Sequence, residues 1–235
     1  MTHWIAYSEP SAARLARLLK SFEESVVCES VTKIESLTPD TQFPSEMPDL
    51  IIVLSQHATT SYLRQFYIVS HARATVLAIG PSTAKGFVES GAFTVKVPDE
   101  TNSEGLLAMP EISALKAHQT VWLLTGEGGR DLVSQSLRER CRLLRFNLYR
   151  REKRQPVLPL NANLQAVWVG SIHGVQQVTA SASHPEIDRY ETSLVVPSER
   201  VADYARGLEW QSVIVCDLSD AKAVQKICAR IKNGG

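Results

Sequence analysis

The stretch VWLLTGEGGRDLVSQSLRER, residues 121–140, decides the fold of this chain. Its apolar run Val121–Leu124 predicts a short buried strand, and a helical pattern begins near Arg130, directly after the turn TGEGG. In a parallel sheet, a strand that enters a helix through a glycine-rich turn can direct backbone N–H groups at an anion. The stretch therefore predicts an α/β fold that carries a candidate anion-binding turn.

The spacing of the glycines in this turn does not match the common nucleotide-binding loops. Gly126 and Gly128 begin a GxGxxG pattern, but Asp131 occupies the position of the third glycine, and no GK[ST] follows. Taken alone, the turn fits equally well a tight strand-to-helix connection that binds nothing. Its chemistry therefore has to be judged from the rest of the chain.

The same order of elements recurs along the chain. Most continuous apolar runs end at Gly, Ser, Thr or Pro and lead into a helical pattern. Such alternation is typical of parallel sheets whose two faces are covered by helices. Besides the run at 121–124, the predicted strands are Trp4–Tyr7, Val26–Cys28, Leu50–Leu54, Val76–Ile79, Phe93–Val97, Ala166–Val169, Leu194–Val196 and Trp210–Val215.

An internal repeat appears when 116 is added to a residue number. The identities at this offset are Ser55/Ser171, His57/His173, Arg73/Arg189, Pro81/Pro197, Ser82/Ser198, Gly91/Gly207 and Ser103/Ser219. They fall at turns, helix caps and strand ends, where geometry restricts the residue type. A weaker echo links Trp4–Tyr7 to Val121–Leu124. The repeat predicts two copies of one α/β unit, but two contiguous halves or a crossed arrangement would both satisfy it.

The composition fits a globular protein without a strong net charge. The 235 residues include 25 basic and 25 acidic side chains, so no global field favours nucleic acid or an anionic membrane. No apolar run approaches the roughly 20 residues of a membrane helix, and the first residues lack the pattern of an export signal. We expect a cytoplasmic monomer without membrane contact. Its scattered cysteines should be reduced, with three of them buried: Cys28, Cys141, Cys216 and Cys228.

Familiar catalytic and metal-binding motifs are missing from the sequence. We find no HExxH, no GxSxG, no EF-hand loop and no CxxC, and we expect neither a metal nor an organic cofactor. His57 and His173 occupy equivalent turns of the repeat. They could share a role facing a ligand, or they could be polar residues at exposed helix starts.

Basic residues crowd the segment from Arg138 to Arg154. A nucleic-acid surface would produce such a run. However, Leu132, Leu137 and Leu144 are spaced as on one helix face, and no nucleic-acid motif accompanies them. We therefore interpret the run as a solvated helix face that attracts an anionic substrate, and we expect no nucleic-acid partner.

Strand ends that open directly into helix N-termini are abundant. In an open parallel sheet such turns line the carboxyl edge, where ligands bind. Each turn offers free N–H groups and the positive end of a helix dipole. Hydrogen bonds to charged groups contribute about 1.5–3 kcal/mol each, so turns facing one cleft could bind a ligand with several carboxylates without any net positive charge. The turns lie at Ser55, Gly80–Thr83, Gly126–Gly129, Ser171 and Pro197–Ser198.

The central segment resembles the signature region of the uroporphyrinogen-III synthase family. LLTGEGGRDL (123–132), LRER (137–140) and LYRR (148–151) stand where that family has a leucine-rich strand with its Gly-x-Gly-Gly-Arg turn, a helix end and a tyrosine-containing strand. AIGPSTA (78–84) is close to the family's AVGPxTA, and LSQHA (54–58) replaces a Thr-Ser-Pro-x-Ala turn. The family has a second Gly-Pro-Thr-Thr-Ala turn, which here reads VPSER (196–200). This turn departs from the family, because Val196 replaces the glycine and Glu199 adds a negative charge.

The resemblance implies a fold and a reaction. The fold would be α/β, with two similar parallel-sheet domains: residues 1–33 with 153–235, and residues 34–152, joined by strands near 31–36 and 148–154. The reaction would be the cofactor-free cyclisation of hydroxymethylbilane, a linear tetrapyrrole with acetate and propionate arms. The last pyrrole ring is inverted and water is lost. The alternative is a non-catalytic, two-lobed protein that binds a small anion.

The resemblance also implies site residues. Tyr149 matches the family tyrosine and could hydrogen-bond the departing hydroxyl as a catalytic residue, or it could be a tyrosine that packs between domains. The substrate's carboxylates would be held by Ser55, Gly80, Ser82, Thr83, Gly126, Gly128, Gly129, Arg130, Ser171 and Ser198.

Overall fold

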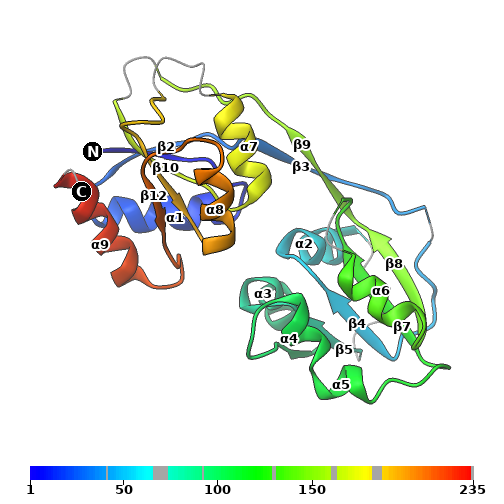
Figure 1. Cartoon of the computed structure of the whole chain (residues 1–235). Helices are drawn as coiled ribbons and strands as arrows, with labels where there is room; N and C mark the ends of the chain where they lie inside the picture. The colour runs from blue at the N-terminus through cyan, green and yellow to red at the C-terminus, as the bar shows by residue number, and fades with distance from the viewer. Residues whose placement is uncertain are drawn as a thin grey trace. The chain divides into compact units, whose positions relative to one another are not determined.

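The computed structural model describes residues 1–40, 42–65, 74–91, 93–128, 131–159, 163–181 and 187–233. The chain divides into two compact units: unit 1 is Met1–Lys33 with Glu152–Gly235, and unit 2 is Ile34–Arg151. Two strands carry the chain from one unit to the other and back, β3 (Thr32–Ser36) and β9 (Tyr149–Lys153) (Figure 1). They run antiparallel, because the N–H of Leu37 donates to the Leu148 carbonyl and that of Arg154 to the Val31 carbonyl.

Unit 2 is a five-stranded parallel sheet with helices on both faces. Its strand order is β6-β5-β4-β7-β8. The strands are β4 (Leu50–Val53), β5 (Thr75–Ala78), β6 (Thr94–Lys96), β7 (Thr120–Thr125) and β8 (Arg142–Asn147). The helices are α2 (Gln56–Gln65), α3 (Pro81–Ser90), α4 (Ser103–Leu107), α5 (Pro110–Ser113) and α6 (Leu132–Arg138).

Burial on both faces explains the continuous apolar runs of this sheet. Ile51 and Val53 of β4 pack on one face in a cluster that includes Tyr62 of α2. Leu50 and Ile52 pack on the other face, in a cluster that includes helices α4 to α6. Because successive side chains of a strand alternate between faces, a strand covered on both sides has to be apolar throughout.

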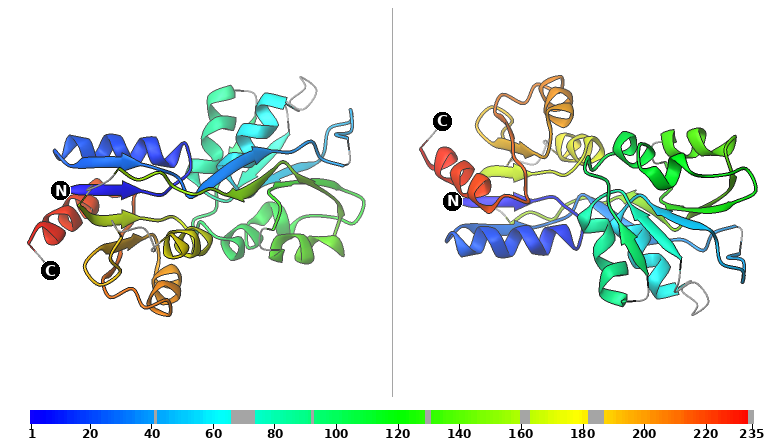
Figure 2. Two further views of the ribbon diagram at one scale, coloured as in Figure 1. Left: turned by 90° about the horizontal axis from the view of Figure 1, so that it is seen from above. Right: turned by 90° about the horizontal axis from the view of Figure 1, so that it is seen from below.

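Unit 1 has the same architecture. Its parallel strands follow the order β12-β11-β10-β1-β2. They are β1 (Thr2–Ile5), β2 (Ser25–Cys28), β10 (Leu164–Trp168), β11 (Ser193–Val196) and β12 (Val213–Val215). The helices are α1 (Ser11–Ser21), α7 (Ile172–Ala180), α8 (Glu199–Arg206) and α9 (Ala221–Lys232). In unit 1, α1 lies on one side of the sheet and α7 and α8 lie on the other (Figure 2).

The strand orders show how the repeat is arranged. When β10, β11, β12, β1 and β2 are read in that order, they occupy the same places as β4 to β8 in unit 2. The weak echo of Val121–Leu124 in Trp4–Tyr7 follows, because β1 is the counterpart of β7. Two contiguous halves are ruled out, since β1 pairs with β10, where Trp4 lies opposite Val167. Arg73 of the repeat lies outside the described residues.

The sequence-based boundaries at Leu144 and Trp210 are wrong, and the first strand is Thr2–Ile5 rather than Trp4–Tyr7. Leu144 lies not on the helix but in β8, opposite Trp122 of β7, because α6 ends at Arg138. The basic run therefore covers the end of a helix and two strands rather than one helix face. Trp210 precedes β12 and is buried, with its indole N–H donating to the Thr179 hydroxyl at 2.9 Å. In both places tertiary pairing overrides an ambiguous local pattern.

Burial of the cysteines follows the expectation. Cys141, Cys216 and Cys228 are buried, and Cys28 is exposed. None of the helices in the described part of the chain combines the length and the apolar character that a membrane span requires.

Candidate functional site

The strand order of unit 2 reverses between β4 and β7. In open parallel sheets, ligands bind at the carboxyl ends of the strands where the order reverses. The turn with Ser55 follows β4, and the turn with Gly126 follows β7. The first residues of β9 lie beside this second turn, because the Leu148 N–H donates to the Thr125 carbonyl and the Glu127 N–H donates to the Tyr149 carbonyl, both at 2.9 Å. Tyr149 is thereby placed at the reversal point.

A glycine makes room for the Tyr149 ring. A Cβ atom added to Gly126 would lie 2.5 Å from Cζ of Tyr149 and 2.7 and 2.8 Å from its two Cε atoms. Carbon atoms in contact normally stay about 3.5–4.0 Å apart, so the ring can occupy this place only next to glycine. The Tyr149 residue is 3% exposed. Gly126 thus positions Tyr149, a role that the spacing of the glycines did not indicate.

Two further side chains contact the Tyr149 ring. The His57 imidazole, at the start of α2, has its ring centroid 5.3 Å away. The Arg151 guanidinium lies 5.0 Å from the ring centroid, within the range of a cation–π interaction. Burial, together with the nearby charge of Arg151, lowers the pKa of His57 to about 4. At neutral pH the imidazole is therefore uncharged, and Arg151 supplies the positive charge at this place.

The sequence had left the role of His57 open. It is half-buried against Tyr149, so it is not a polar residue at an exposed helix start. Arg151 was noticed only as part of a basic run. The alternation of side chains along an extended strand, which puts residues 149 and 151 on one side, was the available signal for their contact.

The predicted residues in the turns of unit 2 differ in exposure and in the hydrogen bonds that they make. The Ser55 hydroxyl accepts the Ala58 N–H at 3.2 Å and so caps α2. Ser82 is exposed in the first turn of α3, which begins after Gly80. Thr83 is 4% exposed, and its N–H donates to the Gly80 carbonyl at 3.0 Å. Gly128 is exposed with φ of 68°, a conformation that favours glycine. Gly129 and Arg130 lie outside the described residues.

Unit 1 reverses its strand order between β10 and β1. Ser171 follows β10 and caps α7, accepting the Gly174 N–H at 3.1 Å. Tyr7 follows β1, and its ring lies where a Cβ on Gly170 would be, which repeats the pairing of a tyrosine with a glycine. Tyr7 was not among the residues predicted from the sequence, because the first strand was expected to include it, whereas β1 ends at Ile5.

The turn after β11 contains Val196 and Glu199, the two residues that depart from the family pattern. Ser198 is the N-cap residue of α8, without a hydrogen bond from its side chain to the helix. Val196 is a buried strand residue. The exposed Glu199 carboxylate pairs with Arg206 at 3.3 Å, so part of its charge is matched within α8.

Among the described residues, carboxylates pair with half of the basic run, four of its eight arginines and lysines. Arg145 contacts Asp131 at 2.5 Å, Arg150 contacts Glu35 at 2.7 Å, and Arg154 contacts Glu29 at 3.3 Å. Arg138 lies 3.9 Å from Asp131 as well. A nucleic-acid surface would present these charges unpaired on one face. The absence of a nucleic-acid partner stays a prediction, which this pairing supports.

A group of possible metal ligands lies at the opposite, amino edge of the unit 1 sheet. Atoms of His3, Glu24 and Cys228 lie within 4.8 Å of one another. However, the Trp168 indole N–H donates to Nδ1 of His3 at 3.0 Å, so the neutral ring carries its proton on Nε2, the nitrogen that faces Glu24. The Lys232 ammonium already contacts the Glu24 carboxylate at 2.7 Å. The group is therefore better explained as a buried ionic network that ties α9 to the sheet.

A cavity of about 750 Å³ lies in unit 2 beyond β6, away from Tyr149. Its charged lining residues are Lys96, Asp99, Glu100, Glu104 and Glu111. Lys96 pairs with Glu111 at 2.5 Å, which leaves an excess of negative charge. An anionic ligand would be repelled from this cavity, so the turns around Tyr149 are the better candidate for one.

Comparison with known proteins identifies the family. A family model described as uroporphyrinogen-III synthase HemD matches residues 13–225. The chain belongs to the uroporphyrinogen-III synthase family. Tyr149, Gly126, Ser55 and Ser171 lie within the matched residues, and the resemblance seen in the central segment is confirmed.

The chain is also similar to curated relatives and to solved structures of this family. The uroporphyrinogen-III synthase of Salmonella typhimurium is 27% identical over 189 residues, and that of Escherichia coli is 29% identical over the same length. Each alignment covers 75% of this chain and 76% of the relative. The structure of the Helicobacter pylori enzyme has a TM-score of 0.62 at 10% identity, covering 98% of this chain and 99% of that one. A mutant enzyme from Thermus thermophilus has a TM-score of 0.59 at 14% identity, covering both chains fully. These structures show a shared fold.

Proposed function

We propose that this chain is the enzyme that converts hydroxymethylbilane to uroporphyrinogen III in tetrapyrrole biosynthesis, with Tyr149 at the reacting end of the substrate. Family membership over residues 13–225 carries the reaction. The placement of the Tyr149 phenol by Gly126, at the point where the strand order reverses, supports the location of the chemistry.

The first step needs a hydrogen-bond donor at the leaving hydroxyl. The C–O bond of the terminal hydroxymethyl group breaks, the oxygen leaves as water with an added proton, and the pyrrole N–H loses a proton to give an electrophilic azafulvene. Tyr149 is proposed to donate a hydrogen bond to the departing oxygen. Within the described part of the chain, no other residue hydrogen-bonds to its hydroxyl. His57 is proposed to hold the Tyr149 ring through their contact.

Ring closure to the inverted isomer then depends on the shape in which the flexible chain is held. Fixing reacting groups in one geometry can contribute several kcal/mol to lowering a barrier. We propose that the exposed Ser82 and the N–H groups around Gly126 and Gly128 bind carboxylate arms, while Thr83 and Ser55 stabilise their own turns. In unit 1, Ser198 is proposed to bind another arm, because its side chain makes no cap hydrogen bond, while Ser171 caps α7 as Ser55 caps α2 and is proposed to bind an arm through the backbone N–H groups of its turn.

Turnover of hydroxymethylbilane tests the function directly. The products are oxidised and the type I and type III isomers are separated by chromatography. The wild-type chain should form the type III isomer, and Tyr149→Phe should slow this at least tenfold without altering thermal unfolding. Tyr190→Phe, at a tyrosine that is 66% exposed, serves as the matched control. Unchanged turnover in Tyr149→Phe would remove the phenol from the mechanism.

The isomer assay also separates the two functions considered. If the wild-type chain yields only the type I isomer, as buffer alone does, the enzyme assignment fails and a two-lobed anion-binding protein is left. The family match does not favour that alternative. A cytoplasmic monomer without metal or cofactor is also proposed, and size-exclusion chromatography with light scattering tests the oligomeric state.

A further inference from the structure

Arg151 differs from most of its basic neighbours, because no carboxylate in the described part of the chain pairs with it. Arg145, Arg150 and Arg154 each contact an acidic side chain. Arg151 is exposed, and its guanidinium instead lies 5.0 Å from the centroid of the Tyr149 ring. Among the described residues, the positive charge next to Tyr149 thus has no carboxylate counterion.

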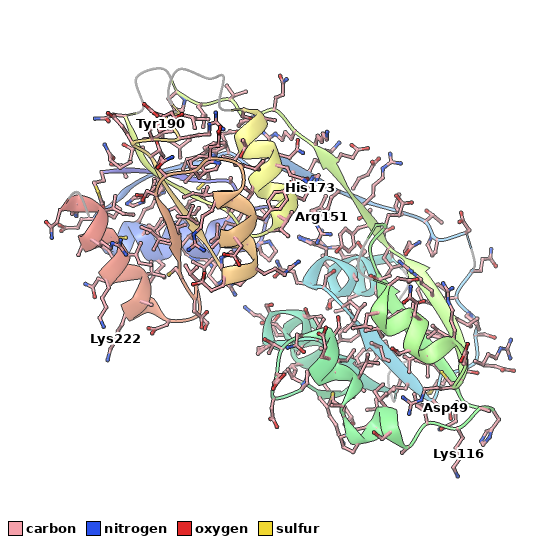
Figure 3. The ribbon with its side chains drawn as sticks, in the orientation of Figure 1. Asp49, Lys116, Arg151, His173, Tyr190 and Lys222 are labelled. Atoms are coloured by element: carbon pink, nitrogen blue, oxygen red, sulfur yellow. The ribbon has the colours of Figure 1, made fainter. Side chains whose placement is uncertain are left out.

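The geometry of β9 explains this difference. Residues 149 and 151 project to one side of the extended strand, whereas Arg150 projects to the other and meets Glu35 of β3 at 2.7 Å. The pairing across the two strands therefore uses Arg150. Arg151 lies beside α2, at the far end of unit 2 from Asp49 and Lys116 (Figure 3).

The surroundings of Arg151 keep its charge constant at neutral pH. A guanidinium does not lose its proton in proteins. The other titratable side chain in contact with Tyr149 is His57, whose pKa is lowered by burial and by Arg151. The Arg151 guanidinium is therefore a planar group with a constant single positive charge, and it is exposed to solvent. Bidentate pairing with a carboxylate requires these properties.

We propose that the Arg151 guanidinium binds a carboxylate arm of the linear tetrapyrrole, and that this pairing places the departing hydroxyl against the Tyr149 phenol. The inference rests on the proposed function for its substrate. It adds a specific receptor to a site whose other proposed contacts come from serine hydroxyls and backbone amides. Arg151 is a binding and positioning residue, and Tyr149 remains the group that contacts the reacting atoms.

Three variants separate charge from geometry. Arg151→Gln removes the charge, Arg151→Lys keeps it but loses the planar fork, and Arg142→Gln is the control. Arg142 is exposed on β8, at the amino edge of the same sheet. Arg151→Gln should raise KM for hydroxymethylbilane about tenfold to hundredfold, the range expected for a lost charge-assisted pair. Arg151→Gln should also lower kcat and the share of type III isomer, because the hydroxyl is no longer placed against Tyr149. Arg151→Lys should recover most of the affinity, but its kcat and its share of type III isomer should remain below those of the wild-type chain.

Two measurements do not depend on turnover. Binding of uroporphyrin, the oxidised octacarboxylate form of the product, should weaken by a similar factor in Arg151→Gln and stay at the wild-type value in Arg142→Gln. In NMR titrations, the pKa of His57 should rise in Arg151→Gln, because a nearby positive charge is removed. Thermal unfolding confirms that each variant is folded.

The outcomes distinguish this inference from the proposed function. If the wild-type chain makes the type III isomer but Arg151→Gln matches it in KM and in uroporphyrin binding, Arg151 is not the receptor. An unchanged pKa of His57 would show that the Arg151 guanidinium does not lie beside His57 and the Tyr149 ring. If the wild-type chain makes no type III isomer yet loses uroporphyrin binding through Arg151→Gln, the receptor stands and the proposed reaction fails.

Discussion

Substituting Gly126 with alanine tests how strictly the Tyr149 ring must be placed. The added methyl group would lie 2.5–2.8 Å from three ring atoms. A comfortable carbon–carbon contact is about 3.5 Å, so the ring must withdraw by about 1 Å. A misplacement of 1 Å can cost roughly 100-fold in rate, or about 2.7 kcal/mol. Overpacking should also reduce the free energy of unfolding by about 1–3 kcal/mol.

The substitution keeps the backbone N–H at residue 126, so any anion contact of that amide is retained. Formation of the type III isomer is measured with saturating substrate, below the melting temperature of every variant. Gly207→Ala is the control, because its φ of −64° suits alanine and the nearest atom to a Cβ there is the Tyr204 carbonyl oxygen at 3.4 Å. Its activity should equal that of the wild-type chain.

A double-mutant cycle shows whether the loss acts through Tyr149. In the Tyr149→Phe background, the catalytic hydroxyl is already gone, so Gly126→Ala should reduce turnover by much less than 100-fold. The stability loss should persist, because phenylalanine presents the same ring to the methyl group. Wild-type turnover in a folded Gly126→Ala variant would refute the argument that ring placement matters.

Two further substitutions test the surroundings of the site. Because its folded-state pKa of about 4 lies below its ordinary value of 6.5, His57 should make the free energy of unfolding rise with pH between these values and leave it level above them. Urea unfolding at several pH values measures how the free energy of unfolding depends on pH. His57→Gln should reduce its rise between about pH 4 and 6.5, whereas the control His118→Gln, at an exposed histidine, should keep the contribution of His57. Phe43→Ala should lower the free energy of unfolding by about 2–4 kcal/mol, because the ring stacks on Phe146 at 3.9 Å and meets the edges of Tyr62 and Trp122. Val157→Ala, at a side chain that is 77% exposed, should change it by less than about 0.5 kcal/mol, and equal effects of these two would contradict the packing argument.

Local patterns were sufficient to predict the parallel sheets and the repeat, whereas the pairing of β1 with β10 decided how the two copies are connected. Continuous apolar runs such as Leu50–Val53 predicted strands buried on both faces, and the turns at their ends predicted where a ligand would bind. The identities at an offset of 116 predicted two copies of one unit. These features can be recognised in the sequence because burial on two faces and tight turns restrict the type of residue at each position, whatever the partner.

Tertiary structure decided which side chains meet. Leu144 is compatible with a helix by its spacing and becomes part of a strand only because β7 offers it an edge. Thr83 matches the family turn in sequence but is buried, which leaves Ser82 as the exposed hydroxyl.

The contacts around Tyr149 likewise come from distant parts of the chain, since His57 and Gly126 reach it from different strand ends. The sequence by itself determined the sheets, the repeat and the family. Only packing decided that a glycine, an uncharged histidine and an arginine with no carboxylate partner among the described residues surround one phenol. Such contacts depend on long-range register and on ring orientation, which local residue patterns do not specify.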